Sequence, residues 1–145
     1  MSNITDTGTT PDTKAHLLAT GYQLIAKKGF TAVGLKQILD TAGVPKGSFY
    51  HYFASKEAFG EAIINHYFSL YKARLDIIDA QNVSAQQKLY DYFQNWYDTQ
   101  QNGCDHDKCL VVKLSAEVAD ISETMRKALD TGYQQTTMWL AEQIK

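Results

Sequence analysis

The chain has 145 residues, which leaves room for one ordinary domain or for two small domains that share an interface. With 44% hydrophobic and 21% charged residues, the composition excludes a disordered chain, and no apolar run approaches the roughly 20 residues that cross a bilayer. The N-terminus has no charged segment followed by an apolar core, which excludes a secretion signal. We therefore expect a cytoplasmic protein without a membrane partner, whose two cysteines are thiols.

The charges are distributed unevenly along the chain. Residues 13–60 carry six lysines against two acidic residues, whereas residues 61–145 carry 8 basic and 12 acidic residues. A basic segment joined to an acidic remainder favours a module that faces a polyanion, attached to a second part with another task.

The predicted elements begin after a polar, threonine-rich stretch at residues 1–11, which we expect to be a disordered tail. A first helix starts at Asp12 or Thr13 and ends before Gly29. A second, short helix ends at Gly43, and a third begins near Pro45, where the missing N–H of proline is not needed. Few segments alternate in the manner of strands, so an all-α fold is predicted.

The remaining elements are also helical. Ser55 is predicted to cap a long helix that runs to about Ile78, and Ser84 opens another helix. Residues 101–108 have the composition of a loop, apolar residues return at 110–121, and a last helix covers 122–145. The helix after Ser84 is expected to pack through its apolar stripe of Leu89, Tyr92, Phe93, Trp96 and Tyr97.

Residues 34–53 have the length and turn chemistry of a helix-turn-helix, and they lead into the stretch GVPKGSFYHYFASKEAF at 43–59. In a third helix of this kind, Lys46 and Ser48 would meet a DNA groove, and Gly47 would allow close approach. Aromatic residues at helical spacing usually form a core, which is the alternative interpretation. Three consecutive polar-tipped rings cannot all be buried on one face, and we expect phosphate contacts from Tyr50, His51 and Tyr52, with Phe49 and Phe53 as anchors.

This block, preceded by KKGF and GLKQILDTAG, resembles the DNA-binding domain of TetR-family transcriptional repressors. The resemblance implies an all-α homodimer on palindromic double-stranded operator DNA in the bacterial cytosol, at the nucleoid. It implies a helix-turn-helix domain at 12–60 and a helical sensor and dimerisation domain at 61–145, which we expect to be truncated at the C-terminus. By the same resemblance, Lys36 joins the groove contacts and Lys56 the phosphate contacts. Pro45, Gly34 and Leu35 depart from the Ser or Thr that many members carry at these positions.

The second informative stretch is CDHDKCLVVKLSAEVAD, residues 104–120, for which three interpretations stay open. Cys109 is a small buried residue, or Cys104, His106 and Cys109 hold a metal ion together with Asp105 or Asp107, or Cys109 is a reactive thiol. The ligand types suit zinc, but the second paired half of a structural site is missing. Lys108 and Lys113 are cations that would lower the pKa of the Cys109 thiol.

The segment CLVVKLSAEVAD resembles the NemR-type subgroup of that family, whose members respond to electrophiles and oxidants. This resemblance implies that modification of Cys109 releases the DNA and that the target genes serve detoxification. It leaves Cys104 as a possible second thiol. Neither a metal nor a cofactor is then expected.

Two further interpretations of the function are open. One is a repressor of the same family that is induced by a non-covalent ligand in a pocket lined by Phe93, Trp96, Tyr97 and Trp139. The other is an enzyme, which the sequence disfavours because it shows neither a nucleotide-binding glycine loop nor a nucleophile beside a base.

Overall fold

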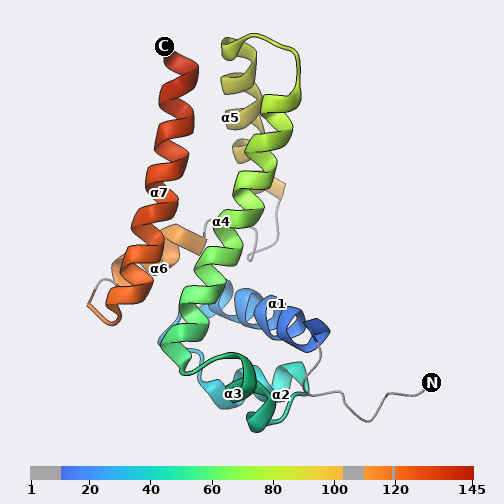
Figure 1. Ribbon diagram of the computed structural model, residues 1–145, viewed down its shortest axis with the longest axis vertical. Helices are drawn as coiled ribbons and strands as arrows, with labels where there is room; N and C mark the ends of the chain where they lie inside the picture. Colours follow the sequence, from blue (N-terminus) through green and yellow to red (C-terminus); the bar gives the residue numbers. More distant parts are fainter. Residues whose placement is uncertain (1–10, 103–109, 119) are drawn as a thin grey trace, which may run out of the picture.

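The computed structural model describes residues 11–102, 110–118 and 120–145, and every regular element in these ranges is an α-helix. The helices are α1 (Pro11–Lys28), α2 (Leu35–Ala42), α3 (Lys46–Tyr52), α4 (Lys56–Ala80), α5 (Ala85–Asn102), α6 (Leu110–Val118) and α7 (Glu123–Ile144). Figure 1 shows α1, α2 and α3 gathered at one end, while α4 and α7 run side by side along the long axis. The predicted all-α fold, with a small helical unit ahead of a larger one, is confirmed.

Glycines end the first two helices. Gly29 follows α1 with φ of 93°, and its N–H donates to the Ile25 carbonyl at 2.7 Å. Gly43 follows α2 with φ of 69°, and its N–H donates to the Leu39 carbonyl at 2.9 Å. Both values lie in the left-handed region that favours glycine, so these two residues set the direction in which the chain leaves each helix.

Serine side chains begin three of the later helices. The Ser55 hydroxyl accepts from the Ala58 N–H at 3.0 Å, the Ser84 hydroxyl from the Gln87 N–H at 3.1 Å, and the Ser122 hydroxyl from the Met125 N–H at 3.3 Å. These bonds satisfy N–H groups that the helices cannot pair internally. Pro45 is the N-cap of α3 and lies one residue before the helix begins. The sequence predicts Pro45 one position later, as the first helical residue.

Buried phenylalanines form part of the core of the small unit. The rings of Phe49, Phe53 and Phe59 are buried, with centroids 5.2 Å apart for Phe49 and Phe59 and 4.8 Å apart for Phe53 and Phe59. Such tilted and edge-on pairs add to the stability that burial alone provides. Because Phe59 belongs to α4, this cluster fixes the short α3 on the long helix behind it, as the sequence predicts.

The aromatic stripe of α5 differs from the expectation. Leu89 and Tyr92 are half-buried, but Phe93, Trp96 and Tyr97 are 54%, 50% and 54% exposed. Helix α5 packs on α4 and α7, and about half of the surface of these three aromatic side chains stays exposed in the part of the chain that the structure describes. Within the described ranges, no helix has both the length and the apolar character needed to span a membrane.

Candidate DNA-binding face and regulatory region

Helices α2 and α3 are joined by a tight turn and held by α1. The N–H groups of Gly43 and Val44 both donate to the Leu39 carbonyl, at 2.9 and 3.1 Å, which closes the turn after α2. The His16 ring of α1 donates through Nε2 to the Ala42 carbonyl oxygen at 2.8 Å. This side chain ties α1 to the end of α2 and thereby fixes where the following α3 starts.

Helix α3 has two faces of opposite character. Lys46, Gly47, Tyr50 and His51 are exposed, whereas Ser48 and Phe49 are buried and Tyr52 is half-buried. The exposed positions follow the spacing of one helical face. We call these four residues the outer face of α3. It presents a lysine, a glycine and two aromatic rings with polar tips to solvent.

The outer face is exposed to solvent. The Lys46 ammonium forms neither an ion pair nor a hydrogen bond within the described part of the chain. A Cβ atom added at Gly47 would meet no heavy atom within 4 Å. Tyr50 is 48% exposed, and its ring packs edge-on against Phe49, with centroids 5.3 Å apart. This arrangement leaves a donor-rich surface that another molecule can approach closely.

Two of the residues predicted to contact DNA, Ser48 and Lys56, do not belong to the outer face of α3. Ser48 is only 8% exposed, because the inner face of α3 lies against the aromatic core. The Lys56 ammonium donates to the Phe30 carbonyl oxygen at 2.9 Å and stands 4.4 Å from the centroid of the Phe30 ring. Partial burial lowers the pKa of Lys56, against the opposing effect of Glu57 and Glu117. Both side chains therefore make contacts inside the protein.

Lys36 lies on the exposed side of α2, one turn from Asp40. Its ammonium donates to the Asp40 carboxylate at 2.7 Å, and this hydrogen bond raises the pKa of Lys36. Both side chains are well exposed, at 88% and 65%. An exposed pair of this kind contributes little to stability, so it leaves the lysine able to turn towards another anion.

The cysteines and the predicted metal ligands lie outside the described residues. Cys104, His106 and Cys109 all fall within 103–109, and no cluster of metal-binding side chains is present in the ranges that the structure describes. Helix α6 begins at Leu110, one residue after Cys109. The Lys113 ammonium in this helix donates to the Lys27 carbonyl oxygen at 2.9 Å, at the end of α1.

A hollow of about 240 Å³ lies between α4 and α5, with one tyrosine from α1 on its wall. Tyr71 and Tyr92 share a hydrogen bond of 2.6 Å across it, and Tyr67 and Tyr71 stack with centroids 5.9 Å apart. Arg74 supplies the positive charge on its wall. Its lining is Tyr22, Tyr67, Leu70, Tyr71, Arg74, Leu75, Ile78, Tyr92, Asn95, Trp96, Thr99 and Gln100.

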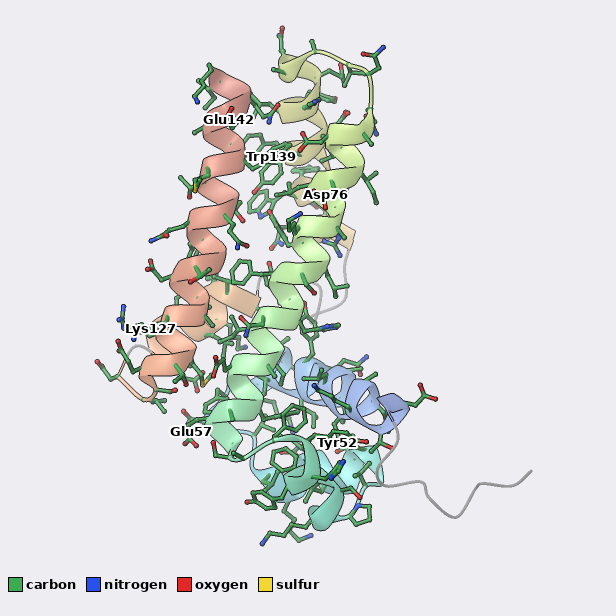
Figure 2. All side chains as sticks on the ribbon, in the orientation of Figure 1. Tyr52, Glu57, Asp76, Lys127, Trp139 and Glu142 are labelled. Carbon is green, nitrogen blue, oxygen red and sulfur yellow. The ribbon has the colours of Figure 1, made fainter. Side chains whose placement is uncertain are left out.

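The four residues predicted to line a ligand pocket are not brought together. Trp96 lines the hollow between α4 and α5, whereas Trp139 lines a second hollow between α4 and α7. Figure 2 shows Trp139 between the long helices, where its indole N–H donates to Asp79 of α4 at 2.9 Å. Phe93 and Tyr97 line neither hollow.

A tight helix–turn–helix held on a third helix, with a basic and aromatic outer face on its second member, defines a helix-turn-helix DNA-binding protein. Residues 17–63 match the family model of the bacterial regulatory proteins of the tetR family. The chain is 44% identical over 138 residues to the HTH-type transcriptional repressor NemR of Escherichia coli K12, covering 92% of this chain and 68% of that protein. The chain therefore belongs to the TetR family, which consists of DNA-binding regulators and not of enzymes.

A solved structure and a further relative support this family assignment. The crystal structure of the reduced form of E. coli NemR superposes with a TM-score of 0.84 at 44% identity, covering 91% of this chain and 69% of that one. The HTH-type transcriptional repressor DhaR of Mycobacterium sp. strain GP1 is 32% identical over 117 residues, covering 80% of this chain and 57% of that protein. The predicted resemblance to the family and to NemR is confirmed.

Sequence reasoning missed two sets of residues. Tyr67, Tyr71 and Arg74 lie at spacings of four and three along α4, a signal for a shared helical face that the sequence does contain. Glu117 of α6 accepts hydrogen bonds from the backbone of residues 30 and 31, and no local pattern indicates this contact because its partners lie 86 and 87 positions away.

Proposed function

We propose that this protein is a transcriptional repressor that binds a palindromic operator as a homodimer and releases it when Cys109 is modified by an electrophile or an oxidant. The observation that carries the DNA-binding part is the outer face of α3, on which Lys46, Gly47, Tyr50 and His51 all point away from the core. The major groove admits a helix with such a face: lysine suits guanine acceptors or phosphate, and the aromatic tips suit phosphate oxygens.

Within this proposal the predicted contacts have unequal roles. Lys36 on α2 and the outer face of α3 meet the DNA. Tyr52 is half-buried and lies against His51, with ring centroids 4.7 Å apart, so it orients that ring as well as reaching towards phosphate. Lys56 holds the loop after α1 in place through its hydrogen bond to the Phe30 carbonyl oxygen, and Ser48 packs on the inner side of α3, where it is 8% exposed.

A matched pair of lysine variants tests the DNA-binding part. Lys46→Ala removes a charge from the outer face, and Lys72→Ala removes the same charge from α4, where Lys72 pairs with Asp76. Figure 2 places Asp76 far from the three-helix end. On DNA selected by the wild-type protein from a random pool, the slope of log affinity against log salt should fall by about 1 for Lys46→Ala only. Equal slopes for the two variants would contradict the proposed contact.

The proposed sensor is Cys109, supported by its neighbours in the chain and by the similarity to NemR. Lys108 and Lys113 favour the thiolate, which is the reactive form. With an α,β-unsaturated electrophile the sulfur bonds to the β-carbon, the carbon–carbon double bond is lost, and water returns a proton to the α-carbon. With a peroxide the thiolate attacks one oxygen, the O–O bond breaks, the other oxygen leaves as hydroxide or alkoxide, and the sulfur becomes a sulfenic acid. Cys104 can then condense with this sulfenic acid to a disulfide as water leaves.

Mass spectrometry tests the site of modification. After treatment with N-ethylmaleimide, the adduct on Cys109 should accumulate in step with the loss of operator binding. The Cys104→Ser variant is the control for the second thiol, and it should lose operator binding at the same rate as the wild type. Loss of binding that follows an adduct at Cys104 instead would refute the assignment to Cys109.

A second candidate function is induction by a non-covalent ligand, and the hollow between α4 and α5 favours it. Its four tyrosines, one tryptophan and Arg74 suit a planar aromatic anion, since rings stack and the guanidinium pairs with a carboxylate. Salicylate is a suitable probe. Release of the operator from a Cys104→Ser, Cys109→Ser double variant by salicylate, with Arg74→Ala unresponsive, would favour this function over thiol sensing.

A further inference from the structure

The loop that follows α1 is hydrogen-bonded to charged side chains from two other helices. The Glu117 carboxylate of α6 accepts from the Phe30 N–H through Oε2 at 3.0 Å and from the Thr31 N–H through Oε1 at 2.6 Å. From α4, the Lys56 ammonium donates to the Phe30 carbonyl at 2.9 Å. The N–H groups of residues 30 and 31 are thus bonded to α6, and the carbonyl group of Phe30 is bonded to α4.

The contact at Glu117 is specific in its geometry. Both carboxylate oxygens are used, each by a different N–H, so the carboxylate matches two consecutive donors that no longer belong to α1. Gly29 lies directly against it: a Cβ atom there would stand 3.0 Å from Oε2, and its φ of 93° also favours glycine. Hydrogen bonds that involve a charged acceptor are among the stronger ones in proteins.

A further hydrogen bond from the same helix reinforces the link. The Lys113 ammonium of α6 donates to the Lys27 carbonyl at 2.9 Å, one helical turn before Glu117. The two side chains bind the end of α1 and the loop after it, so α6 is joined to residues 27–31 by three hydrogen bonds. The buried Val118 and Leu114 anchor α6 itself in the core. A displacement of α6 therefore pulls on α1.

We propose that Glu117, aided by Lys113, is a positioning residue for operator binding: its two hydrogen bonds hold the three-helix unit in the orientation that lets both halves of a dimer meet the operator. Neither side chain contacts DNA. The inference rests on the proposed operator binding, since two α3 helices must lie about 34–36 Å apart to enter successive major grooves. A small rotation of the unit about the loop changes this separation.

The central test compares three full-length variants on the selected palindromic operator and on a duplex that contains one half-site. Glu117→Ala removes both hydrogen bonds. Glu117→Gln keeps one acceptor oxygen but turns an amide NH₂ towards the other N–H. Glu123→Ala is the matched control, because it removes the same charge from an exposed residue of α7 that pairs with Arg126.

We expect Glu117→Ala to lose about tenfold in affinity for the palindrome, within the usual range of coupling between sites, with unchanged affinity for the half-site. The affinity of Glu117→Gln for the palindrome should lie between those of Glu117→Ala and the wild type. Removing a negative charge strengthens DNA binding in general, so Glu123→Ala should bind equally well or slightly better. A loss in Glu117→Ala has the opposite sign and cannot come from net charge.

Hydrogen exchange supplies an independent readout that does not depend on DNA. The amides of Phe30 and Thr31 should exchange at least tenfold faster in Glu117→Ala, whereas those of Gly43 and Val44, bonded to Leu39, should not change. Faster exchange together with wild-type affinity for the palindrome would overturn the positioning role, and unchanged exchange would overturn the contact itself. If the wild-type protein prefers no DNA sequence, the proposed function fails instead.

Discussion

Gly47 on the outer face of α3 allows a prediction in which stability and DNA binding change in opposite directions. The substitution is Gly47→Ala, which adds one methyl group to the second residue of α3. In the free protein that methyl group meets nothing within 4 Å. It therefore causes no clash, and it replaces the residue that has the greatest freedom in the unfolded chain.

The expected sizes follow from these observations. Alanine should stabilise the helix by about 0.5–1 kcal/mol, which for a chain of this length raises the melting temperature by about 1–4 °C. On DNA, the same methyl group occupies the space through which the backbone of α3 approaches the groove. Losing one close contact there costs about 1–3 kcal/mol, a decrease in operator affinity of about 5- to 150-fold.

The assay pairs thermal unfolding with operator titration at a fixed salt concentration, because affinities for DNA depend on salt. The variant should melt slightly higher than the wild type and bind the operator more weakly, with unchanged affinity for unrelated DNA. If Gly47→Ala melts higher and binds the operator as well as the wild type does, DNA does not use the open space at Gly47, and our assignment of the outer face of α3 is refuted.

Three further predictions concern stability and pH. Phe49→Ala should cost about 3–5 kcal/mol in the free energy of unfolding, because the ring is fully buried; a chemical denaturation midpoint close to that of the wild type would contradict this. Gly132→Ala should cost about 1–3 kcal/mol, because its Cβ would overlap the ring of Phe68 between α4 and α7, and an unchanged midpoint would show that the two helices separate easily. Burial raises the pKa of Glu117, but the hydrogen bonds from Thr31 and Phe30, together with the charge of Lys56, outweigh it and lower the pKa. The contribution of Glu117 to stability is therefore present above the ordinary glutamate pKa and is lost as the pH falls below about 4. When the free energy of unfolding is measured from pH 6 to 3, the difference between the wild type and Glu117→Gln should thus become smaller at the acid end.

Features that depend on nearby residues could be predicted from the sequence. The caps at Ser55 and Ser84 are set by the three or four residues that follow each serine, and the structure shows the expected hydrogen bonds. The anchoring role of Phe49 and Phe53 follows from their spacing of four, which places both on one side of a short helix. All of these depend on local geometry, and all were confirmed.

Features that depend on distant residues could not be predicted. Ser48 lies beside Lys46 and Gly47 in the sequence, but it is on the side of α3 that the rest of the fold packs against the core, which leaves it 8% exposed. The aromatic residues of α5 have the spacing of a buried stripe, and only the positions of α4 and α7 decide that Phe93 and Tyr97 stay half-exposed. Glu117 shows the same limit, because its partners come from a loop that the fold alone brings near.

The central claim is the proposal that this DNA-binding protein releases its operator when the Cys109 thiol is modified. The most direct measurement is operator affinity with and without N-ethylmaleimide, in the wild type and in Cys109→Ser. The wild type should lose specific binding after treatment while the variant keeps it, with both proteins equal before treatment. A variant that loses binding to the same extent as the wild type would contradict the claim.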